Sequence, residues 1–254
     1  KLCDMIAGQD KVYETMLLLG VTTDTQDTTG RVLAQRPAVW SASLKTALEA
    51  AVHDFTGDYD QVPPMYSAIK IGGKKLYELA REGKEVKRQP RRVRIYEIKI
   101  MDDGRYDAQA QTVRVALRVH CSKGTYIRTL CHDIGEKLGC GGCMDALVRI
   151  RVGRFDISSA LTLDQIQQMA EAQTLMSAVV PVDEMLCEYP AVYIKAGDCR
   201  PIYNGNPFKA ESIEKAEDAK AFGNVRVYDC NGHFVGVYAC GPDRKQFKPV
   251  KMFL

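Results

Sequence analysis

A tyrosine and an arginine stand two positions apart where the sequence predicts that a strand ends and a helix begins. The stretch from 120 to 140 reads HCSKGTYIRTLCHDIGEKLGC. It breaks at Lys123-Gly124, and Tyr126 and Arg128 follow in the first turn of the expected helix. An aromatic ring can stack on an unpaired base, and a guanidinium can bind a carboxylate or a phosphate through two parallel hydrogen bonds. The pair is therefore a candidate site for nucleotide chemistry, provided that the rest of the chain binds a nucleic acid.

Basic residues cluster from 83 to 94, where GKEVKRQPRRVR contains six Lys or Arg and one Glu. An isolated charge run is more often a solvated loop, but here the last arginines pass directly into a predicted strand. Further Lys and Arg alternate with tyrosines, the composition expected of a surface that binds folded or single-stranded RNA. These residues are Lys70, Lys74, Lys75, Lys123, Arg149, Arg151, Arg154, Tyr66, Tyr77 and Tyr126.

Strands and helices are both expected in the first part of the chain. The first two strands read as a hairpin with a long polar tip. The predicted strands are Val12–Val21, Arg31–Gln35, Arg92–Met101, Thr112–Cys121 and Leu147–Phe155. The predicted helices are Ser43–Phe55 with a serine cap, Lys74–Arg81, one that follows Tyr126 to about Leu138, and Leu163–Ala172.

After Tyr189-Pro190 the pattern changes to short strands. Asn-Gly pairs at 204–205 and 231–232 are strong hairpin signals. We therefore predict a boundary near 188, with a large domain over 1–187 and a small β-rich module over 188–254. Its strands are expected at Ala191–Lys195, Asn224–Cys230 and Phe234–Ala239.

Composition limits the function classes. No apolar run approaches the roughly 20 residues of a membrane span, and the net charge of +3 identifies no partner by itself. Nine cysteines, an odd count spread over 254 residues, do not form the pattern of a disulfide scaffold. Cys140 and Cys143 have CxxC spacing, but no second ligand pair completes a zinc site. We expect reduced cysteines, no metal and a cytoplasmic protein.

Four long motifs occur in order: LGVTTDTQDTTG (19–30), PPMYSAIKIGGKKLYELAREG (63–83), HCSKGTYIRTLCHDIGEKLGCGG (120–142) and LVRIRVG (147–153). They resemble the TruB family of tRNA pseudouridine synthases, which isomerise the T-loop uridine of tRNA. The resemblance implies an α+β fold with a mixed, largely antiparallel central sheet, flanking helices and a C-terminal PUA-like RNA-binding module. It also implies a monomer that binds the T-loop and acceptor arm of tRNA, without a cofactor because the reaction is an internal rearrangement.

The resemblance also assigns residues. Tyr13 matches the tyrosine that stacks on the flipped base, and Tyr126 and Leu147 match other walls of the pocket. Arg128 matches the arginine that keeps a nucleophilic carboxylate ionised beside a phosphodiester. Secondary candidates are Lys1, Asp27, Tyr66 and Lys70, and the RNA backbone is expected at Lys87, Arg88, Arg91 and Arg92.

On the residues alone, Arg128 is by default a surface arginine paired with Asp133 or Glu136. We expect instead that it points into a cleft framed by Tyr13, Tyr126 and Leu147, where it binds water, an anion or a substitute such as Asp27.

The chain departs from the family pattern at its start. The family's catalytic G-T-L-D-P-x-A-T-G motif is absent, and Lys1 corresponds to a lysine that follows it. We therefore expect a chain truncated at its N-terminus and inactive alone, with its aspartate nucleophile upstream. Asp24 and Asp27 belong to a different motif and are not expected to replace it. The alternative is a non-catalytic tRNA-binding or tRNA-folding protein.

Overall fold

The protein is described by a computed structural model that covers residues 2, 5, 8–217, 223–241, 243 and 245–254. It divides into two compact units, Gly8–Ala160 and Leu161–Leu254. The predicted N-terminal candidate Lys1 lies outside the described residues.

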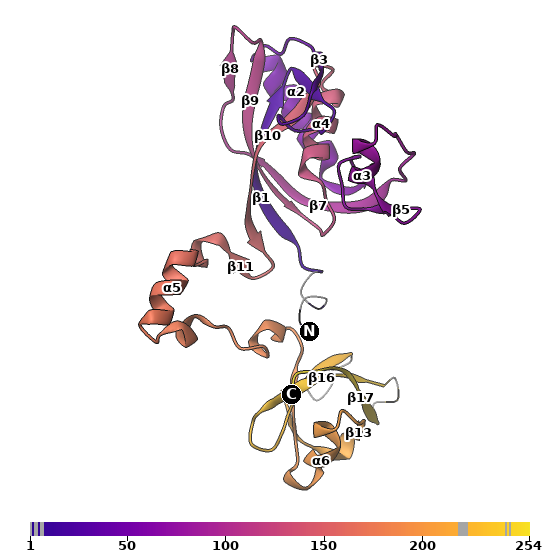
Figure 1. Ribbon diagram of the computed structural model, residues 1–254, viewed down its shortest axis with the longest axis vertical. Coiled ribbons are helices and arrows are strands. Elements are labelled where there is room, and N and C mark those ends of the chain that lie inside the picture. The colour runs from indigo at the N-terminus through magenta and orange to yellow at the C-terminus, as the bar shows by residue number, and fades with distance from the viewer. Residues whose placement is uncertain (1, 3–4, 6–7, 218–222, 242, 244) are drawn as a thin grey trace. The chain divides into compact units, whose positions relative to one another are not determined.

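A seven-stranded sheet forms the centre of the first unit (Figure 1). Its order is β11-β10-β1-β9-β7-β4, with β8 also paired to β9, and every pair is antiparallel. The predicted α+β class with a largely antiparallel sheet is confirmed. The strands are β1 (Lys11–Leu19), β4 (Gly57–Gln61), β7 (Arg91–Ile100), β8 (Arg105–Asp107), β9 (Thr112–Cys121), β10 (Gly142–Val152) and β11 (Phe155–Asp156).

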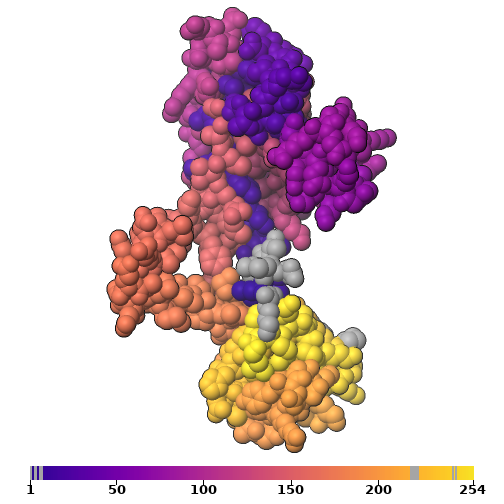
Figure 2. Space-filling view, viewed as in Figure 1, coloured from indigo at the N-terminus to yellow at the C-terminus, as the bar shows by residue number. Residues whose placement is uncertain are grey.

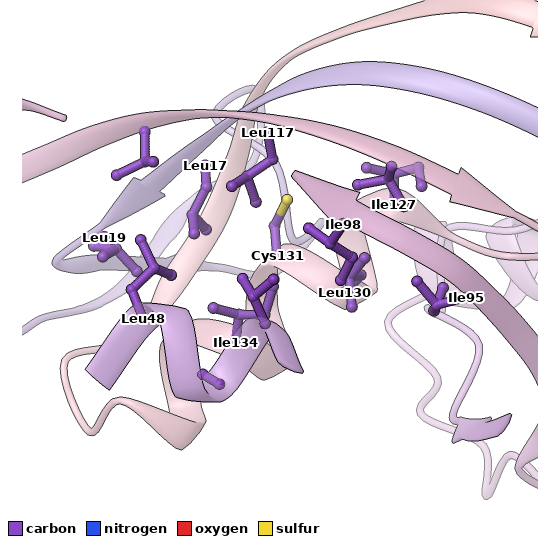
Figure 3. Close-up of a cluster of buried hydrophobic side chains, with 14 of the residues drawn as sticks. Leu17, Leu19, Leu48, Ile95, Ile98, Leu117, Ile127, Leu130, Cys131 and Ile134 are labelled. Atoms are coloured by element: carbon purple, nitrogen blue, oxygen red, sulfur yellow. The ribbon is translucent and has the colours of Figure 1, made fainter. Parts of the chain in front are cut away.

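Two helices, α2 (Ala42–Phe55) and α4 (Ile127–Lys137), pack on one face of this sheet. The Ser41 hydroxyl caps α2 by accepting a hydrogen bond from the Leu44 amide at 3.2 Å. Alternate residues of β9 are buried and meet the apolar stripes of both helices (Figure 3). Each large side chain buried here contributes about 1.5–3 kcal/mol, so this core fixes the position of α4. Its buried members include Leu17, Leu48, Val115, Leu117, Leu130 and Ile134.

The predicted hairpin between Val12–Val21 and Arg31–Gln35 is wrong. Gly20 has φ +103°, a conformation that favours glycine, and it ends β1 before the chain turns into β2 (Val21–Thr23). The strand β3 (Val32–Gln35) pairs with β2, whereas β1 pairs with β9 and β10.

The segment between β4 and β7 folds into a separate lobe of the first unit (Figures 1 and 2). It contains β5 (Lys70–Ile71), β6 (Lys74–Lys75) and α3 (Leu76–Arg81). The helix begins two residues later than predicted because Lys74 and Lys75 pair with β5. Leu76 is fully buried, so this basic segment has an apolar anchor of its own.

The second unit contains α5 (Leu163–Glu171) and a six-stranded sheet in the order β13-β17-β16-β15-β12-β14. The predicted boundary near 188 precedes the first of these strands and stays a prediction. The strands are β12 (Ala191–Ile194), β13 (Phe208–Lys209), β14 (Ile213–Ala216), β15 (Asn224–Tyr228), β16 (Phe234–Cys240) and β17 (Gln246–Met252). Short helical turns lie at Ile157–Ser159 in the first unit and at Leu175–Ala178, Glu184–Leu186, Ala196–Asp198 and Ala210–Ser212 in the second.

Only one of the two Asn-Gly pairs forms a hairpin. Asn231-Gly232 joins the antiparallel strands β15 and β16, as expected. Asn204-Gly205 instead ends the helix α6 (Cys199–Tyr203), where Gly205 takes φ +66°. The hairpin prediction at 204–205 is therefore wrong, because a positive-φ residue also terminates helices.

Substituting Gly135 should destabilise the first unit, because α4 meets the start of β10 there. A Cβ at Gly135 would lie 2.1 Å from the Gly142 amide nitrogen. We expect Gly135→Ala to lower the free energy of unfolding by at least about 1–3 kcal/mol, the usual cost of overpacking. Gly8→Ala is the control, since the nearest atom to its Cβ would be a lysine Nζ at 3.9 Å. Urea unfolding measures both, and equal effects would contradict this packing.

Candidate active site

Tyr126 and Arg128 lie where the chain passes from β9 into α4. Tyr126 is the N-cap residue with an extended backbone, and Arg128 lies in the first helical turn. The turn before them is held by the Thr125 hydroxyl, which donates to the Ser122 carbonyl at 2.9 Å. The sequence therefore fixes both side chains at one end of a buried helix, as predicted.

Arg128 pairs with Asp27, which is 101 residues away in the sequence. Its Nη1 lies 3.2 Å from Asp27 Oδ2 and donates to the Thr25 carbonyl at 3.4 Å. The two side chains are 27% and 15% exposed, so the pair is largely shielded from water. The alternative of pairing along its own helix does not occur, because Tyr59 donates to Asp133 and Arg36 pairs with Glu136.

Asp27 is held by its own loop between β2 and β3. Its Oδ1 accepts hydrogen bonds from the Thr25 hydroxyl at 2.7 Å and from the Thr29 hydroxyl and amide at 2.6 and 3.1 Å. Burial raises the pKa of Asp27, but the bonds from Thr29 and Thr25 and the charge of Arg128 outweigh it and leave the pKa below its ordinary value. Asp27 is therefore an ionised, immobilised carboxylate.

The loop that carries Asp27 is itself pinned to β10. The Thr28 amide donates to the Met144 carbonyl at 2.9 Å, and the Met144 amide donates to the Gln26 carbonyl at 3.0 Å. The Thr129 hydroxyl of α4 also donates to the Gln26 side chain at 2.7 Å. The motif at 19–30 contains Gln26 but assigned it no role, and Met144 lies outside all four motifs; the partners of both residues lie more than 100 residues away.

Four of the predicted residues, together with the secondary candidate Asp27, line one pocket of about 200 Å³. Tyr13 and Leu147 enter it from the paired strands β1 and β10, and Tyr126 and Arg128 enter it from the start of α4. The pocket is several times larger than the roughly 30 Å³ that one water occupies in the liquid, so it has room for one pyrimidine ring. Burial raises the pKa of Tyr13, so its hydroxyl is uncharged at neutral pH. The remaining wall residues are Thr125, Ile127 and Met144.

The predicted RNA-backbone residues differ in their surroundings. Lys87 and Arg91 are exposed, and Arg92 pairs with Asp60 at 3.0 Å on the surface. Arg88 is only 22% exposed and donates to the Pro63 carbonyl at 3.1 Å, so it also supports the lobe.

A hollow of about 530 Å³ lies between the β2–β3 loop and the lobe. Tyr66 and Arg88 line it together with Arg31 and Lys84, beside Asp24 and Glu85. Lys70 is exposed on β5 and lines a separate hollow with Lys87 and Arg91. Lys70, Lys87, Arg88 and Arg91 therefore line two hollows of the lobe and not the small pocket at Arg128, and Arg92 lines neither hollow.

Neither a metal cluster nor a membrane-spanning helix occurs among the described residues. They contain no group of three or more His, Cys, Asp or Glu side chains that could bind a metal ion, and Cys140 and Cys143 are both free thiols. No described helix is long and apolar enough to cross a membrane.

Known proteins resemble the chain over its whole length. Residues 1–127 match the TruB family pseudouridylate synthase N-terminal domain, and residues 128–187 match the tRNA pseudouridylate synthase B C-terminal domain. The chain is 46% identical to a tRNA pseudouridine synthase B of Lachnoclostridium phytofermentans, over 100% of this chain and 83% of that protein. It is 39% identical to a protein of the same name from Azoarcus sp., over 93% of this chain and 73% of the relative.

Solved structures share the fold. A chain in the crystal structure of a Cbf5–Nop10–Gar1 complex matches with a TM-score of 0.65 and 21% identity, over 100% of this chain and 69% of that one. A chain of an H/ACA RNP bound to a substrate RNA containing 2′-deoxyuridine matches with a TM-score of 0.65 and 18% identity, over 100% and 68%. The fold is that of a pseudouridine synthase with a C-terminal β module. The chain belongs to the TruB family of pseudouridylate synthases, which are isomerases, and the predicted resemblance is confirmed.

Removing the charge of Asp27 should destabilise the protein in a pH-dependent way. Because the pKa of Asp27 is lowered in the folded state, its contribution is present above the unfolded value of about 3.9 and is lost as the pH falls through the folded value. We expect Asp27→Asn to cost about 1–3 kcal/mol at pH 7, and the difference from wild type to shrink below about pH 4.

Asp58→Asn is the matched control, because Asp58 faces Arg94 at 3.8 Å with both side chains more than half exposed. An exposed pair of this kind contributes about 0–1 kcal/mol. Urea unfolding between pH 7 and 3.5 measures both variants. If Asp27→Asn lowers the free energy of unfolding by the same amount at every pH, the ion pair does not stabilise the protein.

Proposed function

We propose that the protein is a tRNA pseudouridine synthase that isomerises the T-loop uridine, with the base flipped into the pocket at Arg128. The observation that carries the proposal is the convergence of Tyr13, Tyr126, Leu147 and Arg128 on one base-sized pocket. The names of the relatives supply the tRNA substrate, and the T-loop comes from the family resemblance.

The chemistry requires the uracil to leave its stack. The N-glycosidic bond must break, the base must turn, and a C–C bond must form to the same sugar. Flipping the base costs about a few kcal/mol, and stacking on Tyr13 recovers about 1–3 kcal/mol of this. Tyr126 and Leu147 would limit the space in which the detached base turns.

Arg128 has hydrogen-bonding capacity left for the reaction. Among the described residues, both of its hydrogen bonds use Nη1, and a guanidinium has five N–H donors. Its remaining donors can therefore bind a second carboxylate or a phosphate while Asp27 keeps the side chain in the pocket. The positive charge would hold a nucleophilic aspartate in its ionised form.

Asp27 is a poor nucleophile in this arrangement. Its Oδ1 accepts three hydrogen bonds and its Oδ2 faces Arg128, so an attack would break the bonds to both threonines or to the arginine. We therefore assign the nucleophile to the family's G-T-L-D-P motif upstream of Lys1, and we assign Asp27 the role of positioning Arg128.

The absence of a G-T-L-D-P motif from the 254 residues keeps a second function open. A non-catalytic tRNA-binding or tRNA-folding protein would use the same surfaces. Incubation with a T-arm transcript, followed by digestion to nucleosides and chromatographic separation of uridine from pseudouridine, distinguishes the two functions, because the two isomers have the same mass. We expect no pseudouridine from the 254-residue chain, and turnover once an upstream segment with its aspartate is added. Pseudouridine formed by the 254-residue chain would show that the nucleophile lies within this chain, and Asp27 would be tested next.

Arg128→Lys should impair turnover more than binding. Lysine keeps the charge but cannot bridge two anions with a planar fork. In the chain with its upstream aspartate, we expect single-turnover rates to fall more than tenfold while tRNA affinity changes less than threefold, as for an interaction made mainly in the transition state.

Arg36→Lys is the control for this substitution, because Arg36 pairs with Glu136 near the other end of α4 on the exposed surface. It should leave turnover within about twofold. If Arg128→Lys weakens tRNA binding and leaves the single-turnover rate unchanged, Arg128 contacts RNA without taking part in the reaction.

Exposed cations of the lobe should set the salt dependence of tRNA binding. Removing one cation that neutralises a phosphate should reduce the slope of log Kd against log salt by about 0.7–0.9. We therefore expect Lys87→Gln with Arg91→Gln to reduce the slope by about 1.5. Lys45→Gln is the control, since Lys45 pairs with Asp103 outside the lobe. An unchanged slope in the double variant would place the RNA elsewhere.

A further inference from the structure

Gln61 ends the edge strand β4 and is 1% exposed, although neither the pocket nor the motifs identified above include it as a functional residue. Both ends of its amide bind one residue's backbone. The Tyr126 amide donates to Gln61 Oε1 at 2.8 Å, and Gln61 Nε2 donates to the Tyr126 carbonyl at 3.0 Å. We infer that Gln61 is a positioning residue for the active site, which fixes the Tyr126 backbone and thereby aims both the Tyr126 ring and the Arg128 side chain into the pocket.

The start of α4 lacks the usual means of fixing its direction. A helix normally begins with a side chain that accepts a hydrogen bond from its first turn, but the Tyr126 side chain makes no such bond. The chain before it passes through Gly124 at φ +82° with open space around it, so this turn is not held by packing at that glycine. The two hydrogen bonds between Gln61 and the Tyr126 backbone take over this function at the residue that forms the pocket wall.

The strand β4 holds α4 at a second place. Tyr59 lies two residues before Gln61, on the same face of β4, and its hydroxyl donates to Asp133 of α4. Burial raises the pKa of Asp133. Tyr59 does not line the pocket, and although its hydroxyl also contacts the Gln61 side chain, it makes neither of the two bonds between Gln61 and Tyr126. Tyr59→Phe therefore removes one attachment of the helix and leaves both of those bonds in place. It is therefore the matched control for a general loosening of α4.

The two hydrogen bonds between Gln61 and Tyr126 predict a specific pH dependence of the turnover rate for one variant. An amide offers one acceptor and two donors, whereas an ionised carboxylate offers acceptors only. Gln61→Glu should keep the bond from the Tyr126 amide but repel the Tyr126 carbonyl. A protonated glutamic acid again offers a donor and an acceptor, so lowering the pH should restore both bonds. Burial would raise the pKa of the introduced glutamic acid and bring this recovery toward neutral pH.

Other charged groups near position 61 must be separated from this effect. Tyr59 and Asp133 form a titratable pair on the adjoining elements, and Arg91 is the register partner of Gln61 on β7. Gln61→Met has a similar shape, no polar group and no titration. Any pH dependence that comes from Asp133, Tyr59 or Arg91 will therefore appear in Gln61→Met as well.

The inference rests on the proposed function for its turnover readout. Single-turnover rates and tRNA affinity are measured between pH 6 and 8.5 for wild type, Gln61→Glu, Gln61→Met and Tyr59→Phe, each in the full chain with its upstream aspartate. We expect the Gln61→Met rate to be more than tenfold below wild type at every pH, with tRNA affinity within threefold. Gln61→Glu should match that rate at pH 8.5 and recover at least fivefold relative to wild type at pH 6. Tyr59→Phe should stay within about threefold.

Hydrogen exchange of the Tyr126 amide gives a readout that does not depend on activity. Its protection should fall in Gln61→Met and be retained in Tyr59→Phe. If the wild type forms no pseudouridine, the proposed function fails. This exchange comparison still decides whether Gln61 holds the Tyr126 backbone. Turnover of Gln61→Met within twofold of wild type, or pH profiles of Gln61→Glu and Gln61→Met that run parallel, would overturn the inference. If Gln61→Met does not fold, the pH profile of Gln61→Glu against wild type decides.

Discussion

The ion pair between Arg128 and Asp27 is the constraint around which the first unit is arranged. A largely shielded guanidinium costs several kcal/mol unless a carboxylate and further hydrogen bonds compensate for its lost water. Asp27 meets that need only because Thr25 and Thr29 hold its other oxygen and Met144 pins its loop. The pair is thus a preorganised charge at the wall of a pocket, which is the arrangement that electrostatic stabilisation requires.

The two sides of the pocket are joined by direct packing. Gly135 lets α4 approach the start of β10 to a distance at which no other residue fits, and β10 carries Leu147 five positions further along the strand. On the opposite side, Gln61 and Tyr59 attach the same helix to β4. The helix that carries Arg128 is therefore held by strands that lie toward the two edges of the sheet, β10 and β4. Its side chains can face a reacting base without moving, which lowers the cost of reorganisation during the reaction.

Local patterns in the sequence predicted much of this fold. The bounds of β9 were predicted residue for residue, because its buried positions alternate strictly from Val113 to Cys121. The break at Gly20 and the helix end at Asn204-Gly205 were misassigned, since a positive-φ glycine serves both hairpins and other turns. Tyr13 and Leu147 were predicted from the family resemblance and from no pattern of their own.

Most partners across long sequence separations could not be predicted. Gln61 meets Tyr126 across 65 residues, and this spacing leaves no local signal. Asp27, which meets Arg128 across 101 residues, was expected only as one of several possible partners. Only the folded sheet brings β4, the β2–β3 loop and α4 together. The sequence therefore identified the residues that line the candidate pocket, whereas the structure was needed to identify the groups that hold those residues in place.

The central claim is that the pocket at Arg128 receives a flipped uridine. A crystal structure of the protein with a T-arm stem-loop that carries 5-fluorouridine at the target position tests it most directly. The account predicts that the target base lies outside the loop stack, with its ring against Tyr13 and with Arg128 within hydrogen-bonding distance of a phosphate or carboxylate beside it. A target base that stays stacked in the loop, or that occupies another hollow while this pocket holds only water, would contradict the account.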